Sequence, residues 1–238
     1  MTSTAPTAPG DRRARRRLET IEEILDIAAD VMDESGVNAL SIAEIARRLG
    51  VQPPSIYKYF DSLLAIYDAL FRRGQTEHLA VMQAAMDGAD GSGRGLAALS
   101  AGLEASGRWA LAHQSIAQLM FWRPVPSFEP SAEAFAPSLE MVALQRTALA
   151  QAVADGELGP SADSDEALYV VSVFIAGVLG QAMANEPDLP WGEGRFTPAF
   201  PRLMAVLPRM FPPAAGTPGG GRATARRPRA GQPGRRTA

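Results

Sequence analysis

The sequence predicts an all-α protein with a small N-terminal domain and a larger second domain. Apolar residues recur at the three- and four-residue spacing of amphipathic helices, and no useful length of the chain alternates with the two-residue period of a strand. Glycine and proline interrupt this pattern where helix ends and turns are expected. A chain of 238 residues has room for one small and one medium-sized core.

The first predicted helix runs from about Arg13 to Glu34, and Gly36 stops it. We expect the arm before it, residues 1–12, to be disordered. One face of this helix is apolar and should be buried in the small domain. The residues of that stripe are Leu18, Ile21, Leu25, Ala28 and Met32.

Two short helices joined by a tight turn follow, at about residues 41–49 and 53–59. Ser41 can cap the first, and Glu44, three residues later, can reach back to complete a capping box. Gly50 stands where the helix must end in a left-handed conformation, which costs glycine little.

After this glycine, Val51 can plug the corner between the two helices. Pro53 and Pro54 suit the first turn of the second helix, where a missing N–H donor costs nothing. The pattern predicts a helix-turn-helix, which places its second helix in the major groove of DNA.

The stretch from Ser41 to Phe60, which ends in Tyr-Lys-Tyr-Phe and is followed by Asp-Ser, resembles the DNA-binding domain of the TetR family of transcriptional regulators. The resemblance is strong over about residues 15–72. It implies a helix-turn-helix domain over residues 13–61 and a helical effector-binding and dimerisation domain over 62–212. Two positions depart from the family pattern: Leu63 replaces a frequent lysine, and Pro54 a frequent glycine.

Side chains in and before this motif are candidates for contact with DNA. Gln52, Pro53 and Ser55 lie in the first turn of the second helix, where side chains reach base edges. The Tyr-Lys-Tyr cluster resembles the family's clamp on the phosphate backbone, although one tyrosine can instead pack in the core, Tyr57 more readily than Tyr59. The DNA-contact candidates are Arg16, Ser41, Gln52, Pro53, Ser55, Tyr57, Lys58 and Tyr59. For Ser41, the capping role alone is a sufficient explanation.

Charge is distributed unevenly along the chain, whose net charge is −3. Residues 1–17 carry +4 and residues 213–238 carry +6, whereas residues 18–212 carry −13. This pattern predicts local rather than general contact with nucleic acid. The arginines before the first helix suit phosphate contact but also an ordinary solvated helix start. We expect the Gly-, Pro- and Arg-rich tail, 213–238, to be disordered.

The larger domain is predicted to begin with a helix from Ser62 to about Met86, which links the two domains. A flexible connection, Gly88 to Gly95, follows it. Further helices are expected at about 95–112, 114–122, 131–156, 164–185 and 196–210.

Bulky apolar and a few polar side chains concentrate in the middle of this domain. They can line a pocket for a small, hydrophobic effector, although ordinary core packing explains each residue equally well. For His113 a hydrogen-bonded structural role is the simpler explanation. The candidate pocket residues are Trp109, His113, Met120, Phe121, Phe135, Met141, Gln145 and Phe174.

Residues 167–184 carry no charge and approach the length of a membrane span. Small residues at a four-residue spacing instead favour close helix packing, so we expect helices 131–156 and 164–185 to form a homodimer interface as a four-helix bundle. The candidate interface residues are Ala143, Ala150, Ala176, Gly180 and Ala184. An all-round apolar helix of this kind is expected to be buried.

The sequence therefore predicts a cytoplasmic, homodimeric, ligand-responsive regulator, most simply a repressor bound to a palindromic operator in double-stranded DNA. An activator or a ligand-independent DNA-binding protein is the nearest alternative, and a membrane-associated protein or a small helical enzyme the more distant ones. No cofactor is expected, and no catalytic set, because no Ser/His/Asp or paired-carboxylate spacing is found. No thiolate or multi-histidine metal site is expected, because the chain has no cysteine and only two histidines.

Overall fold

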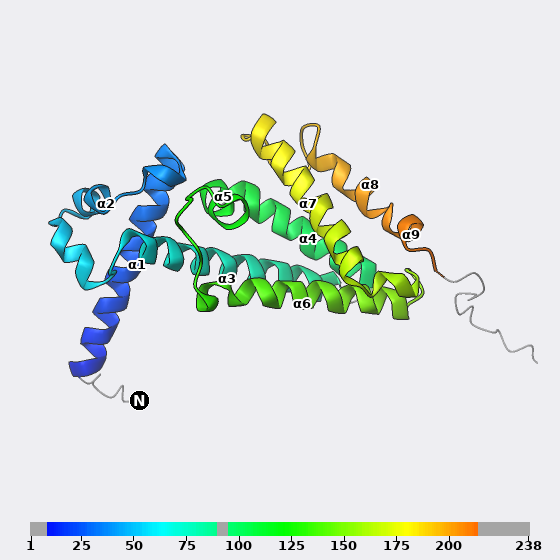
Figure 1. Ribbon diagram of the computed structural model, residues 1–238, viewed down its shortest axis with the longest axis horizontal. Helices are drawn as coiled ribbons and strands as arrows, with labels where there is room; N and C mark the ends of the chain where they lie inside the picture. Colours follow the sequence, from blue (N-terminus) through cyan, green and yellow to red (C-terminus); the bar gives the residue numbers. More distant parts are fainter. Residues whose placement is uncertain (1–8, 90–94, 214–238) are drawn as a thin grey trace, which may run out of the picture.

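The computed structural model describes residues 9–89 and 95–213, and every regular element in these ranges is helical (Figure 1). The predicted all-α class is therefore confirmed. Short 3-10 helices occur at Val37–Ala39 (η1), Pro53–Lys58 (η2), Pro160–Ala162 (η4) and Thr197–Ala199 (η5). The α-helices are α1 (Pro9–Ser35), α2 (Ile42–Leu49), α3 (Leu63–Ala89), α4 (Gly95–Ala112), α5 (Gln114–Trp122), α6 (Ala132–Ala154), α7 (Asp165–Asn185), α8 (Phe200–Met204) and α9 (Leu207–Met210).

Helix α1 begins at Pro9, four residues before the predicted start, so the arginine run is helical rather than part of an arm. Leu18 was expected in the buried stripe but is 61% exposed, because it lies before the part of α1 that packs on the other helices. Ile24 and Val31 are buried instead. The expected disordered arm and tail fall mostly on residues 1–8 and 214–238, which lie outside the described residues.

The turn between α2 and η2 has the predicted chemistry. Ser41 Oγ accepts the backbone N–H of Glu44 at 3.2 Å and caps α2. Gly50 is left-handed, with φ of 72°, and its N–H is directed at the carbonyl oxygens that end α2. Val51 is exposed and does not plug the corner; Ile56 and Phe60 fill the interior there.

Helix α3 passes from the small domain into the middle of the larger one, where α4, α5 and α6 pack around it (Figure 1). Its first half buries Ile66, Tyr67 and Leu70, and its second half buries Met82 and Met86. The predicted linker at 88–95 is shorter than expected, since α3 reaches Ala89, α4 starts at Gly95, and only residues 90–94 lie outside the described part.

Glycine lets α4 approach its neighbours closely. A Cβ on Gly95 would lie 2.2 Å from the backbone nitrogen of Ala152 on α6. A Cβ on Gly102 would lie 2.5 Å from Met86 of α3, and one on Gly107 would lie 2.1 Å from the ring of Trp191. Close packing of α4 therefore depends on the absence of side chains at these positions.

The C-terminal region differs from the prediction of one helix over 196–210. It is divided into η5, α8 and α9, and prolines stand in the first turns of all three. Proline suits a first turn but lacks the N–H that a continuous helix needs, so the chain restarts instead of continuing.

Helix α7 also differs from expectation. In the described residues it is the one helix whose length and apolar composition would suffice to cross a membrane. Only 33% of its most apolar stretch is buried, whereas an all-round apolar helix was expected to be buried. Tyr169 and Val173 are 64% and 67% exposed. One face of α7 packs on α4, α6 and α8, and the other, which carries Tyr169 and Val173, is exposed in the part of the chain that the structure describes.

The Gly50→Ala substitution is expected to lower the free energy of unfolding by about 1 kcal/mol. A Cβ there meets nothing within 4 Å, so the cost arises from the left-handed backbone rather than from a clash. Gly88→Ala is the matched control: its Cβ also meets nothing within 4 Å, but the residue lies within α3. Thermal unfolding of both variants measures this. A Gly50→Ala midpoint equal to that of the Gly88→Ala variant would contradict the expected cost of the left-handed backbone.

Candidate nucleic-acid interface and helical-domain cavity

The second helix of the helix-turn-helix, η2, presents polar side chains outward. Gln52, Tyr57 and Lys58 are exposed, while Ile56 is buried and anchors the helix. Pro53, Ser55 and Tyr59 are half-buried at its edge. The expectation that Tyr57 packs in the core more readily than Tyr59 is wrong, because Tyr57 is 52% exposed and Tyr59 packs against the core.

Arg17 of α1 holds the end of η2 in place. Its Nη1 donates to the carbonyl oxygen of Lys58 at 2.9 Å, and its guanidinium lies over the ring of Tyr59, 5.3 Å from the centroid. Sequence reasoning treated Arg17 only as one of five basic residues. The neighbouring Arg16 is exposed on the same helix. Arg17 therefore stabilises the position of η2, whereas Arg16 is accessible to solvent.

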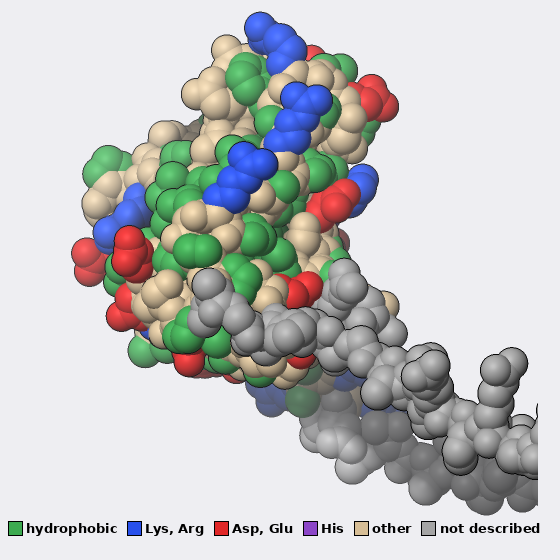
Figure 2. Space-filling view, turned by 90° about the vertical axis from the view of Figure 1, so that its right-hand side faces the viewer, with side chains coloured by type: hydrophobic (Ala, Val, Ile, Leu, Met, Phe, Trp, Pro, Cys, Tyr) green, Lys and Arg blue, Asp and Glu red, His purple; other side chains and the backbone are tan. Residues whose placement is uncertain are grey.

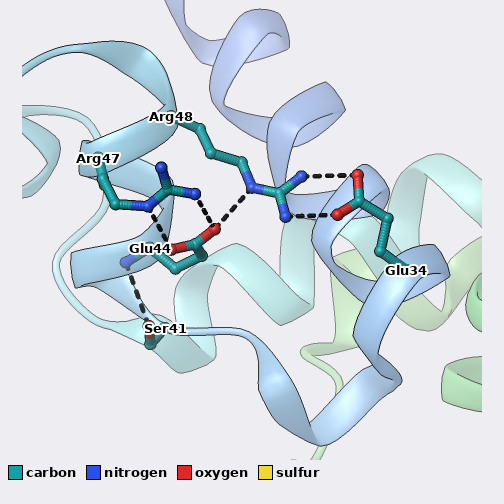
Figure 3. A network of polar contacts seen from close by, with 5 residues as sticks. All are labelled: Glu34, Ser41, Glu44, Arg47 and Arg48. Carbon is teal, nitrogen blue, oxygen red and sulfur yellow. Dashed lines mark hydrogen bonds and ion pairs between the residues drawn. The ribbon is translucent and has the colours of Figure 1, made fainter.

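A network of carboxylates and guanidiniums fixes α1 to α2 (Figure 3). Arg48 donates to both oxygens of Glu34 at 2.9 and 2.7 Å, and its Nε donates to Glu44 at 2.7 Å. Arg47 adds two hydrogen bonds to Glu44, at 2.8 and 2.7 Å. Bidentate pairs of this kind are directional as well as strong, so they set the angle between the two helices.

This network corrects the expected capping box. The carboxylate of Glu44 binds Arg47 and Arg48, and these hydrogen bonds lower its pKa to about 2. The half of the box in which Ser41 accepts the N–H of Glu44 is present. Hydrogen bonds from Arg48 to Glu34 and Glu44 likewise raise the pKa of Arg48. Glu34, Glu44 and Arg48 therefore stay charged over the physiological range.

A cavity of about 410 Å³ lies in the larger domain, walled by residues of α3 to α7. Five of the predicted pocket residues line it: Met120, Phe121, Phe135, Met141 and Gln145. The other three, Trp109, His113 and Phe174, are not part of its lining. His113 instead hydrogen-bonds through Nδ1 to the carbonyl oxygen of Trp109, 2.9 Å away, and stacks on that ring.

Sequence reasoning missed the most polar part of this wall. Gln75 and His78 of α3 line the cavity and are only 4% and 5% exposed. Gln75 Oε1, His78 Nδ1 and Ser138 Oγ are buried and have no hydrogen-bond partner among residues 9–89 and 95–213. An unsatisfied buried polar atom costs about 1–3 kcal/mol. The available signal was the position of Gln75 and His78 in the apolar stripe between Phe71 and Met82.

His78 is fixed in the wall by neighbours on α4. Its Nε2 lies 2.5 Å from Ser106 Oγ, and its ring lies 5.0 Å from that of Trp109. Burial lowers the pKa of His78 to about 4, because a charged ring would lose its hydration. His78 is therefore neutral at pH 7.

Polar contacts tie α3 and α5 to the small domain, and tie α3 to α6. Tyr67 of α3 donates its hydroxyl to the carbonyl oxygen of Val37 at 2.6 Å. Asp68 accepts both the N–H and the hydroxyl of Ser131, the residue that caps α6, at 2.6 and 2.8 Å. Ser115 of α5 donates to Asp33 of α1. A shift of α3 or α5 would therefore be transmitted to α1 and η1.

Lowering the pH from 7.5 to 5 should destabilise the native protein through His78. The folded pKa of about 4 lies below the unfolded value of 6.5, so stability from this group is complete above pH 6.5 and is lost as the pH falls towards 4. At pH 5 the loss is about 2 kcal/mol. His78→Phe should remove this part of the pH dependence, which thermal unfolding at both pH values measures. An unchanged dependence would show that His78 is not responsible.

The small domain is similar in sequence to known bacterial regulators. Residues 24–70 match the family model described as bacterial regulatory proteins, tetR family. The chain is 40% identical over 58 residues to the uncharacterized HTH-type transcriptional regulator YobS of Bacillus subtilis. It is 38% identical over 68 residues to the HTH-type transcriptional activator FasR of Mycolicibacterium smegmatis. These matches cover 24% and 28% of the chain and only 30% and 31% of the relatives.

Solved structures resemble the chain over most of its length. The TetR family transcriptional regulator PfmR of Thermus thermophilus has a TM-score of 0.59 at 22% identity, over 78% of this chain and 97% of that one. The transcriptional regulator FadR of Bacillus subtilis, solved with stearoyl-CoA, has a TM-score of 0.60 at 16% identity, over 78% and 96%. These likenesses establish the fold. Residues 24–70 therefore match the DNA-binding part of the tetR family, and the helical architecture beyond them has the fold of the solved regulators.

Proposed function

We propose that this protein is a homodimeric transcription regulator that binds a palindromic operator in double-stranded DNA and is released from it by a small molecule. The observation that carries the proposal is the η2 helix, whose polar face is exposed while Ile56 and Arg17 hold it from behind. As a DNA-binding regulator, it would act in the cytoplasm.

In this proposal Gln52, Pro53 and Ser55 contact base edges at the start of η2, where a recognition helix enters the major groove. Arg16, Tyr57, Lys58 and Tyr59 contact phosphates and set the position of the domain on the duplex. Ser41 adds a phosphate contact through its hydroxyl hydrogen, since its oxygen already accepts the N–H of Glu44. Arg47 and Arg48 are neutralised by Glu34 and Glu44 and are not assigned such a role.

The homodimer is proposed to form through α6 and α7. Gly177 and Gly180 of α7 would meet nothing within 4 Å if they carried a Cβ, in contrast to the glycines of α4. Packing within the chain therefore gives no reason for small residues there, whereas close approach of a second α7 does. Of the predicted interface residues, Ala143, Ala176 and Ala184 are exposed, and Ala150 and Gly180 are half-buried.

Exposure of apolar side chains alone would not single out this face. Hydrophobic side chains also reach the surface at the end of the molecule that carries α8 and α9 (Figure 2), where Met210 is exposed. The α6–α7 face differs because its large exposed residues, Leu139, Tyr169 and Val173, lie beside a row of small ones. Such a surface allows two helix pairs to pack closely around a two-fold axis.

Ligand control is proposed to act through α3. A ligand in the cavity between α3 and α7 would favour one arrangement of these helices and change the separation of the two η2 helices. That separation must match successive major grooves, about 34–36 Å apart. The ligand shifts the equilibrium only by its difference in affinity for the two arrangements.

The alternative function is activation of transcription instead of repression. It is supported by the similarity to FasR, which is an HTH-type transcriptional activator. The sign of regulation depends on where the operator lies relative to a promoter. Measuring transcription from a selected operator with and without the protein distinguishes the two.

The Lys58→Ala substitution should weaken binding to all duplex sequences and reduce the slope of log K against log salt by about 1. Lys58 is the only lysine of the chain, and it is exposed at the end of η2. Fluorescence anisotropy at several salt concentrations measures both effects. Arg202→Ala, which removes an exposed positive charge on α8, is the control and should change neither. Equal affinity and slope for the Lys58 variant would exclude it from the phosphate contacts.

The Gly180→Leu substitution should prevent dimerisation without unfolding the subunit. Space is open at this Cβ within one chain, so a leucine fits the monomer but obstructs a second α7. Light scattering is expected to give the mass of one chain. Gly88→Leu, also open within the chain but placed near the end of α3, should remain dimeric. A dimeric Gly180 variant would place the interface elsewhere.

A further inference from the structure

The wall of the α3–α7 cavity is free of ionised groups. Its polar side chains are neutral, namely those of Gln75, His78, Ser106, Ser138, Gln145 and Ser172. A ligand carboxylate or phosphate placed at the buried end, beside Gln75, His78 and Ser106, would lose hydration without finding a counter-charge, which is unfavourable. The wall therefore selects an uncharged molecule.

Aromatic and thioether side chains form much of the remaining wall. Phe121, Trp122 and Phe135 supply ring faces and edges, and Met120 and Met141 supply adaptable apolar surface. The volume of about 410 Å³ is in the range of small-molecule sites, which span about 300–1,000 Å³. A flat ring system with a short apolar substituent suits these dimensions and this chemistry.

Two of the unpartnered polar atoms lie three residues apart on α3 and so share one helix face. Gln75 Oε1 accepts a hydrogen bond. His78 Nδ1 donates one in the tautomer in which Ser106 donates its hydroxyl to Nε2. A hydroxyl group both donates and accepts, so one ligand hydroxyl satisfies both atoms. An ether or a hydrocarbon would leave Gln75 unsatisfied.

From these features we propose that the cavity binds a small, uncharged, hydroxylated aromatic molecule, whose hydroxyl pairs with Gln75 and His78. The inference rests on the proposed function in one respect: the cavity is taken as the regulatory site. Because both residues belong to α3, the polar end of the ligand would bind the helix that leads to the small domain. Gln75 and His78 are then the residues that determine specificity.

Three probes of one shape test the polar group: 4-butylphenol, butylbenzene and 4-butylbenzoate. Equilibrium dialysis against the full chain at pH 7.5, without DNA, gives their affinities. We expect 4-butylphenol to bind at least about tenfold more tightly than butylbenzene, which corresponds to a single satisfied hydrogen bond. 4-Butylbenzoate should not bind. Equal binding of phenol and hydrocarbon, tighter binding of the benzoate, or no binding of any probe would overturn the proposal.

Gln75→Leu and His78→Phe test the two residues. Each should reduce the preference for 4-butylphenol over butylbenzene by the loss of one hydrogen bond and leave the affinity for butylbenzene within about twofold. Gln118→Leu, an exposed glutamine on α5 outside the cavity, is the matched control and should keep the full preference. An unchanged preference in both cavity variants would overturn the assignment.

Thermal unfolding without ligand separates a binding role from a structural one. Gln75→Leu removes an unsatisfied buried atom, so its Tm should equal or exceed that of the native protein. A structural hydrogen bond at Gln75 would lower the Tm instead, which would contradict the proposal. Because dialysis needs no DNA, loss of DNA binding with retained phenol preference rejects the proposed function alone. DNA binding without phenol preference rejects this inference alone.

Discussion

Helix α3 runs through one hydrophobic core that continues from the small domain into the larger one, and the rest of the structure depends on its continuity. Its first half buries Ile66 and Leu70, and its second half buries Met82 and Met86, while α1, α4, α5 and α6 pack on the helix. A helix of this length spans about 40 Å. Because both parts of this core pack on a single helix, neither part can shift along it without exposing apolar surface to water.

The same helix explains where buried polar groups are tolerated. At Gln75 and His78 the apolar stripe of α3 is interrupted by side chains that the chain itself does not fully satisfy. The cost is borne in the larger domain. In the small domain the charged groups of this kind lie at the surface, where Arg48 pairs with Glu34 and Glu44. Two features of the larger domain are not explained by its own packing. Polar atoms of Gln75 and His78 are buried without a hydrogen-bond partner among the described residues, and a Cβ on the α7 glycines would meet only open space.

Some elements could be predicted because their causes are local. Gly50 and Ser41 fix the ends of α2, the first through its left-handed backbone and the second through a hydrogen bond to the residue three positions on. The pairing of Arg48 with Glu34 could not be predicted, because the two residues are brought together only when α1 packs on α2. For the same reason Arg17 could not be distinguished from Arg16, although one holds η2 and the other is free to face solvent.

The sequence by itself determined the all-α class, the position of the helix-turn-helix and the family, because helical periodicity, capping and turn chemistry are encoded over a few residues. The tertiary structure decided which side chains are accessible. It turned Tyr57 outward and Tyr59 inward, placed Trp109 behind the cavity wall, and left one face of α7 uncovered. These outcomes depend on how whole helices pack against one another, which no short window of sequence specifies.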